Sequence, residues 1–137
     1  MERTLAIVKP DAFKAGVAGQ ILACYEKAGF AVKAIKLLHL TPAQAGGFYA
    51  VHKKRPFYKE LCRFMSSGPC IALVLEAEDV IQKNRKLMGA TDSAQAAKGT
   101  IRARFGKSLQ NNAVHGSDSP ESAAFEIGYF FNALELV

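Results

Sequence analysis

The chain has 137 residues, half of them apolar, and its mean hydropathy is close to zero, which predicts one globular domain over residues 1–137. The longest apolar run, Cys70 to Leu75, is too short to span a bilayer and excludes a membrane-spanning helix. Eighteen Lys and Arg against 12 Asp and Glu give a net charge of +6, so we expect anionic partners such as nucleotide phosphates, nucleic acid or an acidic membrane surface.

The cysteines and the start of the chain both favour a cytoplasmic protein. Cys24, Cys62 and Cys70 form an odd set without the paired spacing of a metal site, which is typical of thiols in a reducing compartment. The segment from Met1 to Lys9 lacks the long apolar stretch and the small-residue cleavage site of a signal peptide.

The first half of the chain alternates between extended and helical patterns. We expect a buried central strand over residues 3–9, a helix over 17–28, a second strand over 30–40, and helical structure from Pro42 to about Ser67. Pro10 closes the first strand and leaves Lys9 at its end, because a residue before proline is pushed toward extended geometry. Gly29 follows the first helix where a left-handed cap is needed, and Thr41 precedes Pro42 as an N-cap.

The second half adds one clear strand and two helices. We expect a strand over Cys70–Glu76, a helix over Asp79–Met88, and a final helix capped by Ser119 with Pro120 in its first turn. Between Gly89 and Gly116 the apolar period is lost, except for a short helical segment at Thr100–Phe105, so this is a long structured loop of the kind that usually has a function. Strands separated by helices predict an α/β or α+β sandwich.

His115 is the strongest candidate for chemistry, because it lies in a polar, glycine-containing segment that leads into the last helix. A helix N-terminus favours anions, and a nearby imidazole can act as a base or as a nucleophile. Glu126 in that helix could reach one imidazole nitrogen and leave the other free. The alternative is that His115 is an ordinary loop residue.

Other polar residues carry weaker signals. His39, in the second strand, and His52, in a helical stretch, are ordinary packing or surface histidines on spacing alone. Arg102 and Arg104 on the short helix, with Arg85 on the preceding one, either form a guanidinium cluster for phosphates or are solvated surface residues. Several nucleotide and metal motifs are excluded: the P-loop, because Ile101 stands where its first glycine is required, and the Rossmann, HExxH and paired CxxC patterns, which are absent.

Five separated motifs resemble the nucleoside diphosphate kinase family. They are Val8 to Asp11, Phe48 to Phe57, Gly89 to Asp92, Gly99 to Arg102 and Asn112 to Ser119, and the resemblance runs from Arg3 to Phe131. It implies an α+β fold, a ferredoxin-like βαββαβ sandwich whose four-stranded antiparallel sheet is covered by helices, with additional helical segments. It also implies a fourth strand, which we expect at Gln110 to Val114.

The resemblance assigns roles to individual residues. His115 would accept the phosphoryl group, Glu126 would orient its imidazole, and Ser117 would contribute a hydroxyl near the ring. Phe57 would stack on the base. The residues expected to bind phosphates or sugar hydroxyls are Lys9, Tyr49, Arg85, Thr91, Arg102 and Asn112.

The implied activity is ping-pong transfer of a terminal phosphoryl group between nucleoside tri- and diphosphates, with Mg²⁺ as cofactor and no metal ligand assigned on the chain. Stacking on Phe57 implies broad base specificity, because every base has a π-face. A homo-oligomer built on a dimer, either a tetramer or a hexamer, is also implied. Ser93 and Lys98 replace usual prolines of the family and Arg104 a usual acidic residue, which predicts a looser loop and weaker higher assembly.

Two alternatives remain at the level of sequence. A basic nucleic-acid-binding module can have the same small fold, but no strand carries the aromatic signature of RNA-binding domains, and binding of nucleic acid is not required by any motif. A catalytically silent relative acting as a scaffold is the other alternative, although every matched site position keeps its chemistry.

Overall fold

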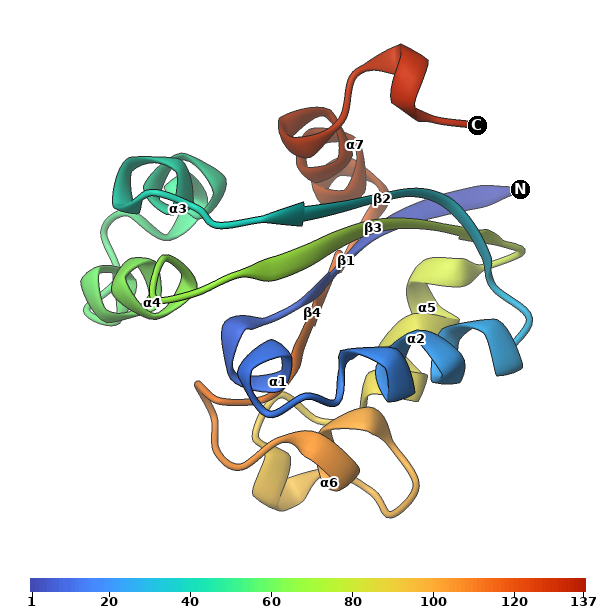
Figure 1. Ribbon diagram of the computed structural model, residues 1–137, viewed down its shortest axis with the longest axis horizontal. Helices are drawn as coiled ribbons and strands as arrows, with labels where there is room; N and C mark the ends of the chain where they lie inside the picture. The colour runs from blue at the N-terminus through green and yellow to red at the C-terminus, as the bar shows by residue number, and fades with distance from the viewer.

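The computed structural model describes residues 1–137 and contains one antiparallel sheet with the strand order β2-β3-β1-β4 (Figure 1). The strands are β1 (Glu2–Val8), β2 (Ala31–Leu38), β3 (Cys70–Ala77) and β4 (Val114–Gly116). All three pairings are antiparallel, with β1 between β3 and β4. The expected ferredoxin-like α+β fold is confirmed.

Strand β1 is buried on both faces, which explains its continuous apolar run. Leu5 and Ile7 belong to one hydrophobic core, and Ala6 and Val8 belong to the other, because successive side chains of a strand point to opposite faces. The sheet therefore has a core on each side, and β1 and β3 are the strands whose buried residues are shared between the two cores.

Helices cover both faces of this sheet (Figure 1). The Ala6 and Val8 face is covered by α1 (Pro10–Lys14), α2 (Ala18–Lys27), α5 (Val80–Met88) and α6 (Ile101–Phe105). The opposite face is covered by α3 (Pro42–Phe48), α4 (Tyr58–Met65) and α7 (Pro120–Phe130). Helices α3 and α4 lie between β2 and β3 in the chain, so they are the additional helical segments that the sequence implied. Three 3₁₀ turns complete the structure, at Ala50–His52, Ser93–Gln95 and Ala133–Glu135.

The position of the fourth strand differs from the expectation. We predicted it at Gln110 to Val114, whereas β4 begins at Val114 and ends at Gly116, so His115 lies within the strand. Ala113 has a φ of +73°, a left-handed conformation that interrupts an extended chain. Pairing with β1 can therefore start only after Ala113.

Two helical segments and one strand end also depart from the sequence pattern. Helix α1 was not expected, because it has only five residues. The helical structure expected from Pro42 to about Ser67 is divided into α3, the 3₁₀ turn at Ala50–His52 and α4. The break before α4 contains Pro56, which disfavours helical geometry in the residue before it. His39 lies just after β2, where its Nε2 is 3.0 Å from the carbonyl oxygen of Ser66.

The predicted N-caps of two helices are confirmed. The Thr41 hydroxyl accepts a hydrogen bond from the backbone N–H of Gln44, and the Ser119 hydroxyl accepts one from Ser122. Each cap forms a reciprocal capping box, which satisfies donors that a helix start otherwise leaves free. No helix in the structure is both long enough and apolar enough to cross a membrane.

The loop between α5 and β4 contains a site where a proline should fit. Ser93 is the first residue of the 3₁₀ turn, and its buried hydroxyl has no hydrogen-bond partner. The preceding Asp92 has φ and ψ values of −78° and 112°, which a following proline accepts. We expect Ser93→Pro to stabilise the fold by about 0.4 to 1 kcal/mol by restricting the unfolded chain.

Thermal melting checks this prediction, and the melting temperature of Ser93→Pro should rise by a few degrees. Ala94→Pro is the matched control, because the backbone N–H of Ala94 donates to Asp92 Oδ1 at 3.1 Å and a proline would remove that bond. The control should melt at a lower temperature than the parent protein. A lower melting temperature for both variants would contradict the prediction.

Candidate active site

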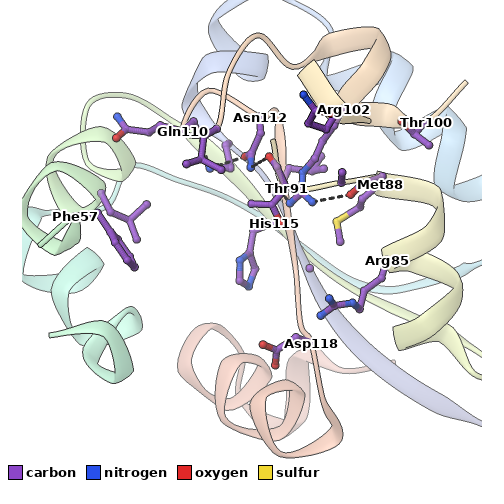
Figure 2. Close-up of a pocket in the computed structure, with 18 of the residues that line it drawn as sticks. Phe57, Arg85, Met88, Thr91, Thr100, Arg102, Gln110, Asn112, His115 and Asp118 are labelled. Carbon is purple, nitrogen blue, oxygen red and sulfur yellow. Dashed lines mark hydrogen bonds between the residues drawn. The ribbon is translucent and has the colours of Figure 1, made fainter. Parts of the chain in front are cut away.

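A cavity of about 1020 Å³ lies at one end of the sheet, between α4, α5, the loop before β4 and β4 itself (Figure 2). Eight of the ten site residues predicted from the sequence line it: Lys9, Tyr49, Phe57, Arg85, Thr91, Arg102, Asn112 and His115. The two others lie behind His115: Glu126 forms a hydrogen bond with His115, and Ser117 forms one with Glu126. The structure thus brings together segments from five distant parts of the chain.

The imidazole of His115 is held on one side and open on the other. Its Nε2 is 2.8 Å from Glu126 Oε1, and a carboxylate can only accept, so Nε2 carries the hydrogen. The rings of Phe48 and Tyr49 meet the imidazole edge-on, with centroids 5.3 Å and 6.2 Å away. Nδ1 is therefore the nitrogen with a free lone pair, and the His115 side chain lines the cavity (Figure 2).

Ser117 acts on Glu126 instead of on the imidazole. Its hydroxyl donates to Glu126 Oε1 at 2.8 Å and accepts from the backbone N–H of Leu5 at 3.2 Å. The side chain is completely buried and does not reach the cavity. The sequence placed a hydroxyl near the ring; the structure makes Ser117 a bridge between the carboxylate and strand β1.

The turn before His115 is strained and strongly held. At Ala113 the backbone has positive φ, and the N–H of Val114 bonds to the carbonyl of Asn112 at 2.8 Å, which closes a γ-turn. Asp11 Oδ2 accepts a hydrogen bond from the N–H of Ala113, and the carbonyl of Ala113 accepts one from the N–H of Lys9. A non-glycine residue keeps such a conformation only where its surroundings determine it.

Lys9 is a buried cation in the wall of the cavity. Only 5% of the residue is exposed, and its ammonium donates to Asn112 Oδ1 at 2.8 Å and to the carbonyl of Gln110 at 2.9 Å. Burial lowers the pKa of Lys9 from its ordinary 10.5 to about 8, although Asp11 opposes this change, while Arg102 adds to it. An ammonium has three donors, so one remains available to a ligand.

Asn112 and Arg102 are also partly engaged with the protein. The Asn112 amide donates to the carbonyl of Thr91 at 2.9 Å while accepting from Lys9. Arg102 donates to the carbonyls of Gly89 and Val114 at 3.0 Å and 2.9 Å, and its buried Nε has no partner. Each of these side chains keeps at least one N–H unused, because the guanidinium has five and the amide two.

Arg85 and Asp118 lie on the same side of the cavity, near the start of α7 (Figure 2). Asp118 accepts from the Ser122 hydroxyl at 2.8 Å, and this bond, together with the positive charge of Arg85, lowers the pKa of the Asp118 carboxyl. Asp118 was not among the site residues predicted from the sequence. Its position directly before the N-cap Ser119, within the segment that contains His115, was the available signal.

Phe57 stands at the rim of the cavity, away from His115 (Figure 2). It is 47% exposed, so it is not part of the hydrophobic core. His52 also lines the cavity, and its ring centroid is 5.5 Å from that of Phe57. Arg104 is outside the cavity: its guanidinium lies 4.7 Å from the centroid of the Phe105 ring and donates to Cys24 Sγ.

The charged groups of the cavity are mainly basic. Four cations, Lys9, Arg85, Lys86 and Arg102, stand against the carboxylates of Glu60 and Asp118. No group of three or more His, Cys, Asp or Glu side chains has the geometry to hold a metal ion. A free imidazole nitrogen among cations is suited to attack an anionic electrophile, since the cations offset the charge of that group.

Comparisons with known proteins agree with each other. A model of the family described as nucleoside diphosphate kinase matches residues 2–136. Two relatives of that description, from Syntrophotalea carbinolica and Dinoroseobacter shibae, are 61% and 60% identical over the whole of this chain and over 100% and 98% of their own lengths.

Solved structures are similar over the same range. The nucleoside diphosphate kinase of Aquifex aeolicus has a TM-score of 0.98 at 52% identity, with 99% of both chains covered. That of Halobacterium salinarum, in complex with CDP, has a TM-score of 0.95 at 40% identity, with 99% of this chain and 91% of the other covered.

The buried charge of Lys9 should make stability depend on pH. Because the pKa of Lys9 is lower in the folded protein than in the unfolded chain, the unfolded state binds more protons between about pH 8 and 10.5. The free energy of unfolding contributed by Lys9 should therefore rise through this window, by roughly 3 kcal/mol in all. Below about pH 8 the buried ammonium should be at its most costly.

Urea denaturation of the parent protein and of Lys9→Met across this pH range measures the effect. All other titrating groups are common to both proteins, so the difference between their free energies of unfolding isolates Lys9. Loss of the two hydrogen bonds changes that difference equally at every pH. Parallel pH profiles for the two proteins would show that Lys9 does not titrate in this window.

Proposed function

The chain belongs to the nucleoside diphosphate kinase family and transfers the terminal phosphoryl group of a nucleoside triphosphate to a nucleoside diphosphate, and we propose that His115 carries this group. The observation that supports His115 is the hydrogen bond between its Nε2 and Glu126, which leaves Nδ1 as the nucleophile in a basic cavity. Phosphorylation would then occur on Nδ1.

The proposed transfer has two half-reactions in one cavity. The lone pair of His115 Nδ1 attacks the γ-phosphorus of the triphosphate, the bond from that phosphorus to the bridging oxygen breaks, and the diphosphate leaves. Glu126 accepts the Nε2–H throughout and offsets the positive charge that forms on the ring. A second diphosphate then attacks the phosphohistidine through a terminal oxygen and restores the neutral imidazole. No separate base is required.

The cations and amides have proposed roles that follow from their unused donors. Lys9, Arg85 and Arg102 would bind the phosphates, because each has an N–H that the protein does not use. Asn112 and Thr91 would contact the sugar or phosphates. The hydrogen bonds from Lys9 to Asn112 and from Asn112 to the Thr91 carbonyl fix these groups before the ligand enters, which reduces the reorganisation that binding requires.

Tyr49 would complete the site from the side of α3. Its ring packs edge-on against His115, and its residue lines the cavity. Burial, with the nearby Glu126 carboxylate, raises the pKa of Tyr49 above its ordinary value, so its hydroxyl stays protonated and remains a donor.

We also propose Mg²⁺ as the cofactor. The cavity has two separate carboxylates and no cluster of three ligands, which suits an ion that is held by substrate phosphates and water and not by a protein cage. Asp118, beside Arg85, is the residue that would hold its water ligands. When bound, Mg²⁺ would offset negative charge on the phosphate oxygens.

Phe57 is proposed to bind the base by stacking. It is exposed at the rim, near the aliphatic Leu61 and the ring of His52. Stacking needs little hydrogen-bond recognition, so purines and pyrimidines would be accepted alike. The alternative of a nucleic-acid-binding module is not favoured, because the basic residues of the cavity surround a histidine with a free ring nitrogen.

Further proposals concern the whole protein. One sheet shared by two cores supports a single domain over residues 1–137. Three free cysteines support a cytoplasmic location.

Strand β2 is at the edge of the sheet, with Ile35 and Leu37 exposed, and this supports a homo-oligomer built on a dimer. Light scattering of dilute samples distinguishes a dimer from a tetramer or hexamer.

The phosphohistidine can be tested directly. With γ-labelled ATP the protein should acquire an acid-labile, base-stable label, and addition of GDP or CDP should discharge it. His115→Ala should lose both the label and nucleotide-to-nucleotide transfer. His39→Ala is the control, because this exposed histidine lies outside the cavity and should keep full activity. Transfer by His115→Ala at near the parent rate would contradict the mechanism.

The stacking role of Phe57 predicts a uniform loss of affinity. Phe57→Ala should weaken the binding of ADP, GDP and CDP by similar amounts, on the order of 1 to 3 kcal/mol, without lowering the melting temperature. Isothermal titration calorimetry measures the three affinities. Phe125→Ala, which removes an exposed phenylalanine outside the cavity, should leave all three unchanged. A loss confined to one base would contradict stacking.

A further inference from the structure

A second concavity, of about 610 Å³, lies between α3 and α4 and shares no residue with the active site. Small residues of α3, including Ala43, Gly46 and Gly47, form one wall. The other wall comes from α4 and the preceding turn and carries Lys59 and Arg63. We call this concavity the α3–α4 groove. Because no active-site residue lines it, nucleotide binding does not account for it.

The basic residues of the groove have no acidic partners. Lys53, Lys59 and Arg63 are exposed, and none of the ion pairs of the structure involves them. Residues 42–69 hold five Lys and Arg but only one acidic residue, Glu60. Glu60 itself lines the active-site cavity and not the groove. Much of the excess positive charge of the protein is therefore concentrated around this groove.

The two sides of α4 serve different concavities. Glu60 and Leu61, with Phe57 just before the helix, line the active-site cavity, whereas Lys59 and Arg63 line the groove. The two basic residues are four positions apart, so they lie one helical turn from each other, with a rise of about 6 Å between them. The cations thus form a row along the groove.

Glycines and an alanine form much of the α3 wall of the groove. A Cβ atom at Gly46 would lie 2.8 Å from the Tyr58 hydroxyl, which donates to the carbonyl of Gly46 at 2.9 Å. A Cβ at Gly47 would lie 2.5 Å from the hydroxyl of Tyr129, a residue of α7 that does not line the groove. Gly46, Gly47 and Ala43 thus leave this wall without large side chains, opposite the charged wall of α4.

We propose that the α3–α4 groove binds an extended acidic peptide segment of a partner protein. In an extended chain every second side chain is on the same face, with a spacing of about 6.6 Å. Acidic residues at alternate positions would match the spacing of Lys59 and Arg63, and small residues between them would face the opposite wall, which Ala43, Gly46 and Gly47 form. Charge complementarity would give specificity and speed association.

A single-stranded nucleic acid fits the groove less well. Such ligands are bound largely by stacking on exposed aromatic faces. Tyr58 is the only aromatic residue lining the groove; its hydroxyl is bonded to Gly46, and its ring packs against the core. The chemistry of the groove therefore favours carboxylates on a peptide.

The test uses a fluorescent peptide that alternates glutamate and alanine, titrated with the full protein at low ionic strength. The parent protein should bind it, and the double variant Lys59→Glu/Arg63→Glu should bind at least about tenfold more weakly. Lys27→Glu/Lys83→Glu is the matched control: it changes the net charge equally at exposed positions outside the groove, and its affinity should change by less than about twofold.

A second variant separates the effect of filling the groove from the effect of changing its charge. Ala43→Trp fills the groove without changing the net charge, and it should also abolish peptide binding. Saturating ATP should not displace the peptide, and both groove variants should keep the parent turnover with ATP and GDP, which makes this test independent of the proposed catalytic roles. The proposal would be overturned if the parent protein did not bind the peptide, if the control pair weakened binding equally, or if ATP displaced the peptide. It would also be overturned if an oligothymidine bound more tightly than the peptide, with the same sensitivity to the variants.

Discussion

The carboxylate of Glu126 is the group on which the geometry of the active site depends. One of its oxygens accepts from both His115 and Ser117, each at 2.8 Å. Ser117 in turn is bonded to Leu5 through its side chain and its backbone, so α7 is tied to the central strand β1. A single carboxylate oxygen therefore joins a helix, an edge strand and the middle of the sheet, and it fixes which imidazole nitrogen is free.

Residues that line the cavity also hold the backbone in place. Lys9 and Arg102 donate to carbonyls of the segment that leads to His115, and Asp11 binds the strained Ala113. Such an arrangement costs stability, because a buried ammonium and a residue with positive φ are both unfavourable. We infer that it is tolerated because the same contacts position His115, the proposed nucleophile, and leave donors free for an anion.

The helix pair α3 and α4 contributes to two separate concavities of the protein. It is inserted between β2 and β3, and one side of α4 contributes Leu61 to the active-site cavity. Its other side carries Lys59 and Arg63 along a separate groove. A short helix that separates two concavities can place a nucleotide-binding surface and a protein-binding surface within one turn of each other, since adjacent residues on a helix face different ways.

Sequence by itself determined the buried strand β1, the caps of α3 and α7, and the identity of the family, because these depend on local patterns and on motifs. It also named eight residues that the cavity brings together. Tertiary structure alone decided the start of β4. The family resemblance placed this strand from Gln110, but the left-handed Ala113 delays it, and the distant Asp11 holds Ala113 in that conformation. The role of Ser117, the inclusion of Asp118 and the groove on α4 also required the fold. Each arises from contacts between distant segments, and a local sequence pattern carries no information about which segments meet.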